Sequence, residues 1–258
     1  MINITAIIQA RLGSTRLPGK TMKELAGKPL LGHLISRIKK SKYIEDIIIA
    51  TTTQERDDRI VQFAAENNLK FFRGDEDDVL DRFYQAAVTW QCETIVRVTP
   101  DCPMLDPQIT DRVILEYLSG RYDYVCNVMP PTYPDGLDTE VFSFQALARA
   151  WREAKLLSER EHVTAYIVKH PDLFKLGNVS KEGKNISWMR WTVDTQNDYE
   201  FVSHIFEKIG NSSEIFYLED VLKVLKENPE LIKINKGIER NEGYRLSLMK
   251  DERDENRA

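Results

Sequence analysis

Several polar stretches of the chain could do chemistry, and the first combines three cations with small residues. In QARLGSTRLPGK, Arg11, Arg16 and Lys20 follow an apolar run. Guanidinium and ammonium groups bind phosphate, and the glycines and Ser14 let backbone N–H groups approach an anion. The spacing differs from the GxxxxGK[ST] phosphate loop. We interpret the stretch as a triphosphate-binding loop, with a solvated basic loop as the alternative.

Two aspartates that follow apolar runs are candidates for holding a divalent cation. Asp101 comes just after TIVRVT, and Asp194 comes after ISWMRWTV. A carboxylate at the end of a strand can bind Mg²⁺, although one aspartate rarely holds the ion without help from phosphates. The alternative is that Asp101 caps a turn and Asp194 the next helix. Asp106, directly before a proline, fits a helix cap better than a metal ligand.

Three further polar stretches are candidates for the nucleotide and sugar pockets. RGDEDDVLDR places acids at a helix start, where they favour the helix dipole, but its Arg73 and Gly74 could line a nucleotide pocket. DGLDTE and EREHVT lie in the later half of the chain. From the second of these, Arg160, Glu161 and His162 could contact a polyhydroxylated, anionic acceptor. His162 could equally be a structural histidine.

The elements that must position these groups alternate between strand and helix up to about residue 120. Apolar β-rich runs predict strands at 3–10, 46–52, 69–72 and 94–99, and helical spacing predicts helices at 30–40, 57–67, 77–92 and 107–119. This alternation indicates an α/β fold with a mostly parallel twisted sheet and helices on both faces. In such sheets ligands bind beyond the carboxyl ends of the strands, which is where the polar stretches begin.

The pattern changes after residue 120. Two strand-like pieces flank a proline-rich loop in 123–142, which we interpret as an inserted hairpin or lid. Further expectations are helices within 143–170, a strand at 186–193 that returns to the site, and helices at 196–209 and 218–228. Residues 1–245 would form a single domain, followed by a polar tail at 246–258 that frays from Lys250.

Composition excludes several classes of protein. The chain has 258 residues, enough for one large α/β domain. Its net charge of −5 argues against a nucleic-acid-binding surface. The three cysteines match no zinc pattern and, being odd in number, no disulfide framework. Since the start resembles no signal peptide and no apolar run reaches membrane-helix length, we expect a cytoplasmic protein without a membrane or nucleic-acid partner.

The run IIQARLGSTRLPGK closely resembles the opening signature of CMP-sugar synthetases. The chain resembles cytidylyltransferases of the spore coat polysaccharide biosynthesis protein F type, which are related to the CMP-KDO and CMP-sialic acid synthetases. Their pattern recurs in ATTTQERDD, RGDEDDVLDRFYQAA, RVTPDCPMLDP, GLDTEVF, REHVTAYI and RWTVDTQND, so that the resemblance spans roughly residues 2–210. TPDCP departs from the QGDEP-like motif of the CMP-KDO synthetases, and the acceptor-sugar residues therefore do not carry over from those enzymes.

The resemblance implies the Rossmann-like fold of nucleotide-diphospho-sugar transferases and a homodimer. It also implies transfer of CMP from CTP to a sugar, expected to be acidic, with Mg²⁺ as cofactor and release of pyrophosphate, for surface polysaccharide or glycan synthesis. The alternatives are a glycosyltransferase, whose nearest DxD-type motif would be Asp75-Glu76-Asp77, and a non-catalytic nucleotide-binding protein.

Each candidate position takes a role on this basis. Arg11, Arg16, Lys20 and Asp101 are the catalytic candidates, and Asp101 and Asp194 would hold Mg²⁺. The nucleotide-binding candidates are Ala10, Arg11, Leu12, Gly13, Ser14, Lys20, Thr51, Thr52, Arg73, Gly74, Asp78 and Asp101. The sugar-binding candidates, from the later polar stretches, are Gly136, Asp138, Glu140, Arg160, Glu161, His162 and Arg190.

Overall fold

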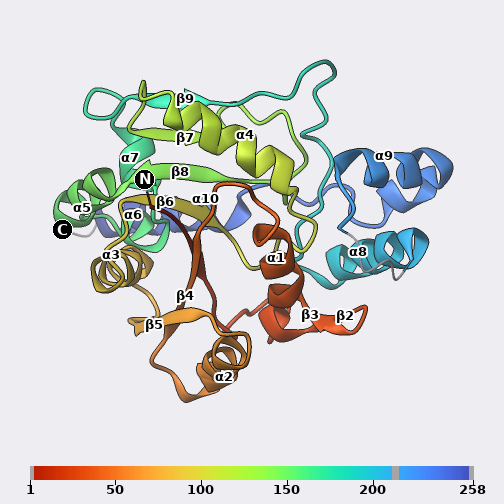
Figure 1. The fold of residues 1–258 in the computed structure, drawn as a ribbon, viewed down its shortest axis with the longest axis horizontal. Helices are drawn as coiled ribbons and strands as arrows, with labels where there is room; N and C mark the ends of the chain where they lie inside the picture. Colours follow the sequence, from red (N-terminus) through yellow and green to blue (C-terminus); the bar gives the residue numbers. More distant parts are fainter. Residues whose placement is uncertain (1–2, 211–214, 256–258) are drawn as a thin grey trace.

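A seven-stranded sheet with the strand order β5-β4-β1-β6-β8-β7-β9 forms the centre of the protein (Figure 1). The structure is a computed structural model that describes residues 3–210 and 215–255. The strands of the sheet are β1 (Ile4–Gln9), β4 (Asp46–Thr52), β5 (Lys70–Gly74), β6 (Thr94–Val98), β7 (Tyr124–Cys126), β8 (Glu140–Ser143) and β9 (Leu176–Asn178). A separate two-stranded ribbon consists of β2 (Glu24–Leu25) and β3 (Lys28–Pro29).

Helices cover both faces of this sheet, as the alternation of elements predicts. The α-helices are α1 (Leu30–Ile38), α2 (Asp58–Glu66), α3 (Val79–Thr89), α4 (Pro107–Leu118), α5 (Phe144–Glu153), α6 (Leu157–Glu161), α7 (Ala165–Lys169), α8 (Gln196–Ile209), α9 (Leu218–Glu227) and α10 (Glu242–Glu255). Short 3₁₀ helices are η1 (Lys20–Met22), η2 (Glu55–Asp57) and η3 (Pro229–Lys233). None of the helices in the described part of the chain is both long and apolar enough to cross a bilayer.

Alternating strand side chains divide the apolar core into two layers. Ile7 and Ile48 face the layer formed with α3, α5 and α7. Ile8 and Ile49 face the layer formed with α1, α2 and α4. Strand β1 pairs parallel with β4 and β6, and β4 pairs parallel with β5, so these strands end at one edge of the sheet. The prediction of a mostly parallel α/β sheet is therefore confirmed.

The strand-like pieces within 123–142 form β7 and β8, which pair antiparallel. Both belong to the main sheet, because β8 also pairs antiparallel with β6, and β7 pairs parallel with β9. The two pieces thus form the predicted hairpin, and this hairpin is part of the main sheet rather than a separate lid. The physical reason is burial on both faces: Val125 and Val141 face one core layer, while Tyr124 and Phe142 face the other.

Two other expectations differ from the structure. Residues 186–193 form no strand, and one isolated bridge joins Arg190 to Asp135. Their apolar side chains, including Trp191 and Val193, instead enter a third core cluster with α8 and α9. The chain from Lys250 does not fray in its described part, because α10 continues to residue 255 and the Asp251 carboxylate accepts a hydrogen bond from the Ser158 backbone.

Candidate active site

The carboxyl ends of β1, β5 and β6 bring the predicted polar stretches that contain Lys20, Arg73 and Asp101 to one edge of the sheet. The stretch that carries Asp194 arrives from the far half of the chain. The Val193 N–H donates to the Asp101 carbonyl oxygen (2.8 Å), and the Thr192 hydroxyl donates to the same oxygen (3.2 Å). These bonds fix residues 192–194 beside the loop that follows β6, so the return of this segment to the site is confirmed although it is not a strand.

Lys20 lies between the two aspartates that were predicted to bind metal. Its Nζ atom is 2.9 Å from Asp101 Oδ2 and 2.6 Å from Asp194 Oδ1. Burial disfavours the charged lysine, but the two carboxylates outweigh burial and raise the pKa of Lys20 to about 12. Burial likewise opposes ionisation of Asp101, yet chiefly Lys20 lowers the pKa of this carboxyl to about 2. Two carboxylates thus converge on one cation.

This arrangement fits Mg²⁺ in its donor chemistry. Oxygen donors from Asp101 and Asp194 point at one position that a cationic group already occupies, and Mg²⁺ prefers carboxylate oxygens. No group of three or more histidine, cysteine or acidic side chains in the described ranges could hold a metal by itself. Phosphate oxygens and water would therefore have to complete the coordination, as is usual for Mg²⁺ bound with a nucleotide.

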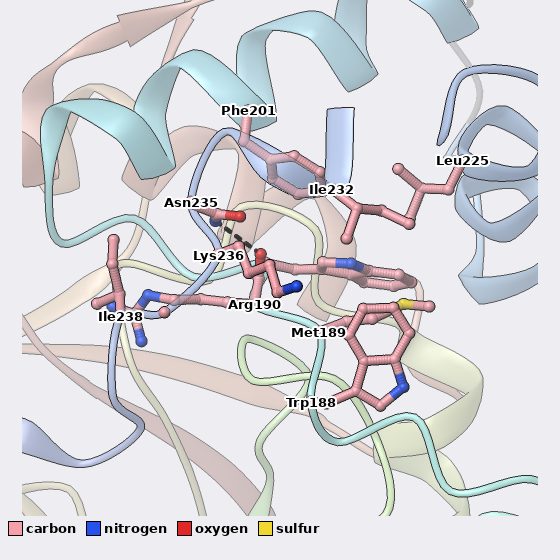
Figure 2. A pocket seen from close by; sticks show the side chains of 11 residues that line it. Trp188, Met189, Arg190, Phe201, Leu225, Ile232, Asn235, Lys236 and Ile238 are labelled. Carbon is pink, nitrogen blue, oxygen red and sulfur yellow. Dashed lines mark hydrogen bonds between the residues drawn. The ribbon is translucent and has the colours of Figure 1, made fainter. Parts of the chain in front are cut away.

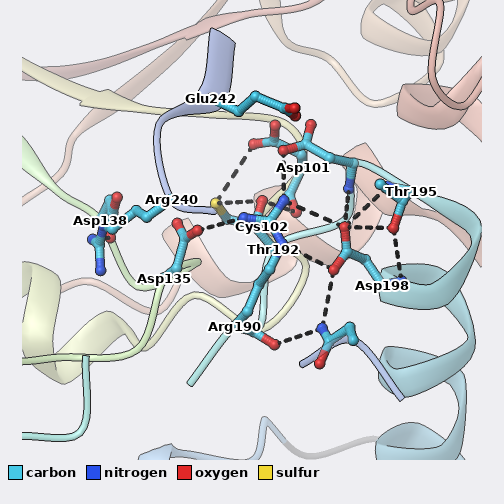
Figure 3. Close-up of polar contacts among 12 residues, drawn as sticks. Asp101, Cys102, Asp135, Asp138, Arg190, Thr192, Thr195, Asp198, Arg240 and Glu242 are labelled. Carbon is cyan, nitrogen blue, oxygen red and sulfur yellow. Dashed lines mark hydrogen bonds and ion pairs between the residues drawn. The ribbon is translucent and has the colours of Figure 1, made fainter. Parts of the chain in front are cut away.

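Arg190, predicted to bind the sugar, lines the cavity and holds carboxylates in place (Figure 3). It donates to Asp135 (2.6 Å), Asp194 (2.8 Å) and Asp198 (2.9 Å). Asp198 is fully buried and also accepts from the Asp194 N–H (3.1 Å) and from Asn235 Nδ2 (3.0 Å). Burial would lower the pKa of Arg190, but these carboxylates raise it further above its ordinary value. The network therefore fixes the orientation of Asp194.

Capping explains the neighbouring aspartates. Thr195 is the N-cap of α8, and Asp198 is its partner in a capping box, so Asp194 itself does not cap the helix. Asp106 caps α4 by accepting from the Gln108 N–H (2.8 Å), as predicted. These contacts separate the two structural aspartates from Asp194, which faces Lys20.

The phosphate loop after β1 is held by a residue that the sequence did not single out. Asp57, fully buried at the end of η2, accepts from the Leu12 N–H (2.7 Å) and from the Thr52 hydroxyl. In the sequence it looked like part of an acidic helix start, and no local signal distinguished it from Asp58. Its contacts link the loops after β1 and β4, so Asp57 positions the loop that was predicted to bind phosphate.

The cations of the phosphate loop already have partners. Arg16 contacts Glu242 (2.6 Å) and Asp194 (3.2 Å), while Arg11 lies 3.5 Å from Glu76. Glu76 also approaches Gly13 so closely that a Cβ atom there would lie 2.8 Å from its Oε1 atom. An incoming phosphate would have to replace these carboxylates at the guanidinium groups.

The residues after β4 and β5 that were predicted to bind the nucleotide mainly hold the backbone around the site. Arg73 donates to the carbonyl oxygens of Thr52 (2.8 Å) and of Gln54 (3.0 Å). Asp78 caps α3, and its carboxylate pairs with Arg160 (2.5 Å). The Thr51 hydroxyl is buried and has no hydrogen-bond partner within the described part of the protein.

A cavity of about 450 Å³ opens beside the two aspartates. Of the predicted residues, those that line it are Arg16, Asp101, Asp138, Glu140, His162, Arg190 and Asp194. Gly136, Arg160 and Glu161 do not line it. Gly136 has φ +109°, and a Cβ atom there would lie 2.6 Å from the Thr192 backbone nitrogen, so this glycine permits close backbone packing. Arg160 binds Asp78, and Glu161 accepts from the Ser247 hydroxyl (2.7 Å).

His162 combines a cavity-lining position with structural contacts. Its Nε2 atom lies 3.1 Å from the Ser247 hydroxyl oxygen, and its ring packs edge-to-face on Tyr244. Burial is the main cause that lowers the pKa of His162 to about 4, with Arg97 acting in the same direction. The imidazole is therefore neutral near pH 7.

The C-terminal segment supplies a wall of the cavity that sequence reasoning missed. Residues lining the cavity from this segment are Glu239, Asn241, Glu242, Gly243 and Tyr244. Nearby, Arg240 binds Asp138 (2.5 Å). Burial, with help from Asp135, raises the pKa of Asp138 to about 7 against the opposing effect of Arg240. The segment has no apolar periodicity and no motif, so nothing in the sequence indicates that it reaches the site.

A smaller cavity of about 40 Å³ lies next to Arg190 on its apolar side (Figure 2). Trp191 and Phe201 are among its walls, and Asn235 Nδ2 donates to the Arg190 carbonyl oxygen (2.9 Å). This volume suits about one water molecule rather than a substrate. The larger cavity, beside Asp101 and Asp194, is therefore the candidate for the acceptor.

Comparison with known proteins gives a consistent picture. Residues 5–208 match the family model described as cytidylyltransferase. The chain is 36% identical to the uncharacterized protein MJ1063 of Methanocaldococcus jannaschii, covering 95% of this chain and 98% of that protein. It is 33% identical to the spore coat polysaccharide biosynthesis protein SpsF of Bacillus subtilis, covering 89% of this chain and 97% of that protein. A cytidylyltransferase structure from Leptospira borgpetersenii superposes with a TM-score of 0.86 at 33% identity, covering 93% of this chain and 100% of that one.

Proposed function

Because the chain belongs to the cytidylyltransferase family of nucleotidyltransferases, we propose that it transfers CMP from CTP to a sugar hydroxyl, releasing pyrophosphate. The product would be a CMP-activated sugar for surface polysaccharide or glycan synthesis. The observation that carries the proposal is the convergence of Asp101 and Asp194 on Lys20, beside a cavity large enough for a sugar that both aspartates line. Nucleotidyl transfer needs this combination of acids, cations and an acceptor cavity in one place.

Mg²⁺ is the cofactor that the two carboxylates would hold, and when bound it would supply Lewis-acid polarisation of the α-phosphate. With the carboxylates engaged in that way, Lys20 becomes free to bind phosphate oxygens. Arg16 would likewise exchange Glu242 for phosphate. Together with Arg11, these cations would stabilise the negative charge that builds up on the departing pyrophosphate.

The remaining residues act by positioning. Asp57 holds the Leu12 N–H, and Arg190 holds Asp194, so both halves of the site are fixed before substrate arrives. The cavity beside Asp101 would orient the attacking hydroxyl toward the α-phosphorus, and such orientation supplies a large part of the rate enhancement in bimolecular transfers. The proton of the attacking hydroxyl would leave with the departing pyrophosphate or pass to solvent, because the lowered pKa of His162 makes its imidazole a weak base.

At the candidate motif of the glycosyltransferase alternative, the first carboxylate binds backbone N–H groups. The Asp75 carboxylate accepts from the backbone N–H groups of Asp77 and Asp78, both at 2.8 Å. It therefore closes a turn before α3. A glycosyltransferase would also release no pyrophosphate from CTP, so the product separates the two functions.

The test is pyrophosphate release by the purified full chain with Mg²⁺, each of the four NTPs and a panel of sugars. We expect release with CTP and a sugar, and loss of at least about 99% of the rate in Asp101→Asn. Asp172→Asn, an exposed aspartate outside the cavity, is the matched control and should keep the full rate. Wild-type rates in a folded Asp101→Asn protein would refute the role of Asp101, and CTP binding without release would favour a non-catalytic nucleotide-binding protein.

A further inference from the structure

One wall of the larger cavity comes from a part of the chain beyond residues 5–208, the part that matches the family model. Residues 236–255, which we call the C-terminal strap, comprise a connecting stretch and α10. The strap follows Asn235, a buried residue whose Nδ2 atom donates to the Arg190 carbonyl oxygen (2.9 Å) and to Asp198 (3.0 Å). The strap therefore starts from a fixed point of the site.

Two ion pairs hold the connecting stretch against the cavity. Arg240 donates to Asp138 (2.5 Å), and Glu242 accepts from Arg16 (2.6 Å). The side chains of Arg240 and Glu242 extend in opposite directions from the strap (Figure 3). Asn241 between them has φ +58°, a left-handed conformation that asparagine adopts more readily than most residues. The strap is thus tied to the acceptor side through Arg240 and to the phosphate loop through Glu242.

Polar contacts dock α10 on α6 and on the residue that follows it. The Ser247 hydroxyl donates to Glu161 (2.7 Å), and its oxygen lies 3.1 Å from His162 Nε2. One turn further along α10, the Asp251 carboxylate accepts from the Ser158 N–H (3.1 Å). These contacts orient α10 but are made by polar groups, which can exchange them for contacts with water at a small net cost.

α10 adds little apolar contact to this docking. Of residues 242–253, Ser247 and Asp251 are buried, and both are polar, whereas Leu246 and Met249 are exposed. No residue in this range belongs to the three apolar core clusters. Elements with few buried apolar contacts open locally at a low free energy. α10 is therefore able to detach from α6 while the rest of the protein stays folded.

Arg16 joins the strap to the phosphate side of the site. Its guanidinium group is held by Glu242 and lies 3.2 Å from Asp194. The loop that carries Arg16 is fixed, because Asp57 accepts from the Leu12 N–H. The Arg16–Glu242 pair itself is more than one-third exposed on both sides and can open without moving the loop. A triphosphate carries more negative charge than one carboxylate and accepts parallel hydrogen bonds from a guanidinium group, so it can replace Glu242.

We infer that Glu242 is a latch that holds the C-terminal strap against the site until the CTP phosphates take Arg16 from it. Release of Glu242 leaves the strap held by Arg240 and by the polar contacts of α10, so that it opens more often and uncovers the larger cavity. The contact between Arg245 and Glu239 (3.3 Å) lies within the strap and moves with it. The inference rests on the nucleotide site of the proposed function, but it does not require transfer of CMP.

Thermodynamic linkage fixes the size of the effect. An ion pair this exposed changes an equilibrium by a factor of about two to five. Because coupling between two sites is reciprocal, CTP promotes opening of the strap by about the same factor by which loss of the latch tightens CTP binding. The two factors are measured independently, so their agreement is a test of the latch.

The experiment is amide hydrogen exchange of the full chain, followed by mass spectrometry without sugar, so that no turnover is needed. We expect saturating CTP with Mg²⁺ to speed exchange in residues 242–255 by about two- to fivefold. Cytidine, which lacks phosphates, should leave the exchange rate unchanged. Glu242→Gln should show the faster exchange without CTP and should bind CTP about two- to fivefold more tightly in calorimetry. Glu227→Gln on α9 is the matched control and should behave as the wild type, because Glu227 is exposed and does not line the cavity.

The outcomes separate the latch from the proposed function. CTP binding with unchanged or slower exchange in the strap would overturn the latch and leave the transfer reaction intact. Faster exchange with cytidine alone, or an equal response to CTP in Glu242→Gln and the wild type, would also overturn the latch. Faster exchange with CTP but no pyrophosphate release with any sugar would support the latch and overturn the transfer reaction. Failure to bind CTP would overturn both.

Discussion

The phosphate side and the acceptor side of the site are built from different kinds of contact. On the phosphate side, the loops after β1 and β4 are held by Asp57, while Arg11 stays 38% exposed and lies 3.5 Å from Glu76. On the acceptor side, Arg190 is 7% exposed and binds three carboxylates closely. The first arrangement leaves cations able to change partner, whereas the second fixes carboxylates in one geometry. The cations on the nucleotide side can therefore exchange their carboxylate partners for phosphate. The carboxylates on the acceptor side are held in one arrangement by Arg190.

The largest effect on stability should come from removing Arg190, which holds the carboxylates of the acceptor side. Arg190→Met leaves Asp198, which is fully buried, without its guanidinium partner. Removing one member of a buried ion pair costs about 3–5 kcal/mol, and we expect a loss of this size in the free energy of unfolding, measured by chemical denaturation. Arg149→Met, which breaks a pair with Glu153 on the exposed face of α5, should cost less than about 1 kcal/mol. Equal losses in the two variants would contradict a special role for the Arg190 network.

The variant Lys20→Ala tests the phosphate side of the site. Lys20 binds the two aspartates in this structure and would bind phosphate during the reaction, so its removal should raise the KM for CTP more than that for the sugar. We expect kcat/KM for CTP to fall by about 100-fold, the size of effect seen when one charged transition-state donor is removed. Steady-state kinetics with each substrate varied in turn would measure it. An unchanged dependence on CTP concentration would exclude Lys20 from the phosphate site.

The same contrast explains how much could be predicted from the sequence. The strands at the phosphate side are apolar runs of the expected length, and each is followed at once by its polar loop, so local pattern indicated both the fold and Lys20 with Asp101. Asp194 was also found, because it follows an apolar run, although that run enters a core cluster rather than the sheet. Local sequence pattern was therefore enough to predict those site residues that directly follow the end of an apolar run.

The acceptor side could not be predicted in this way because its contacts join distant segments. Arg240 meets Asp138 across 102 residues of chain, and Arg16 meets Glu242 across 226. Arg190 carried the right kind of charge for a substrate ligand, and although it lines the cavity, it is bound to Asp135, Asp194 and Asp198. Arg160 is likewise bound to the cap of α3. The residue types were visible in the sequence, whereas the pairings that decide their roles depend on the tertiary fold.

A smaller effect should appear in the pH dependence of stability. Burial lowers the pKa of His162 in the folded protein to about 4, below the ordinary value of 6.5. Because the folded state binds this proton less readily than the unfolded state, the contribution of His162 to stability is present above pH 6.5 and is lost as the pH falls toward 4. Allowing for partial exposure, the loss is about 1–2 kcal/mol.

The measurement is chemical denaturation of the wild type and His162→Asn at pH 7.5, 5.5 and 4.5. The difference in unfolding free energy between the two proteins should shift in favour of the variant as the pH falls. His204→Asn is the control, since His204 lies on the exposed face of α8 beside Glu207. A wild-type-minus-variant difference that stays constant with pH would contradict burial of a neutral imidazole.

The smallest effect should come from Glu242→Gln, which links the two sides of the site. Its carboxylate holds Arg16 at 2.6 Å, but both side chains are more than one-third exposed, so the pair adds less than about 1 kcal/mol to stability. The kinetic consequence has the opposite sign to that of Lys20→Ala, because Arg16 no longer has to leave an acid before it binds phosphate. We therefore expect the KM for CTP to fall by about two- to fivefold at low ionic strength, and the difference to shrink in high salt. If the KM for CTP rises instead, Glu242 orients Arg16 for phosphate binding rather than competing with phosphate. That result would contradict the idea that the cations on the phosphate side must leave a carboxylate before they bind CTP.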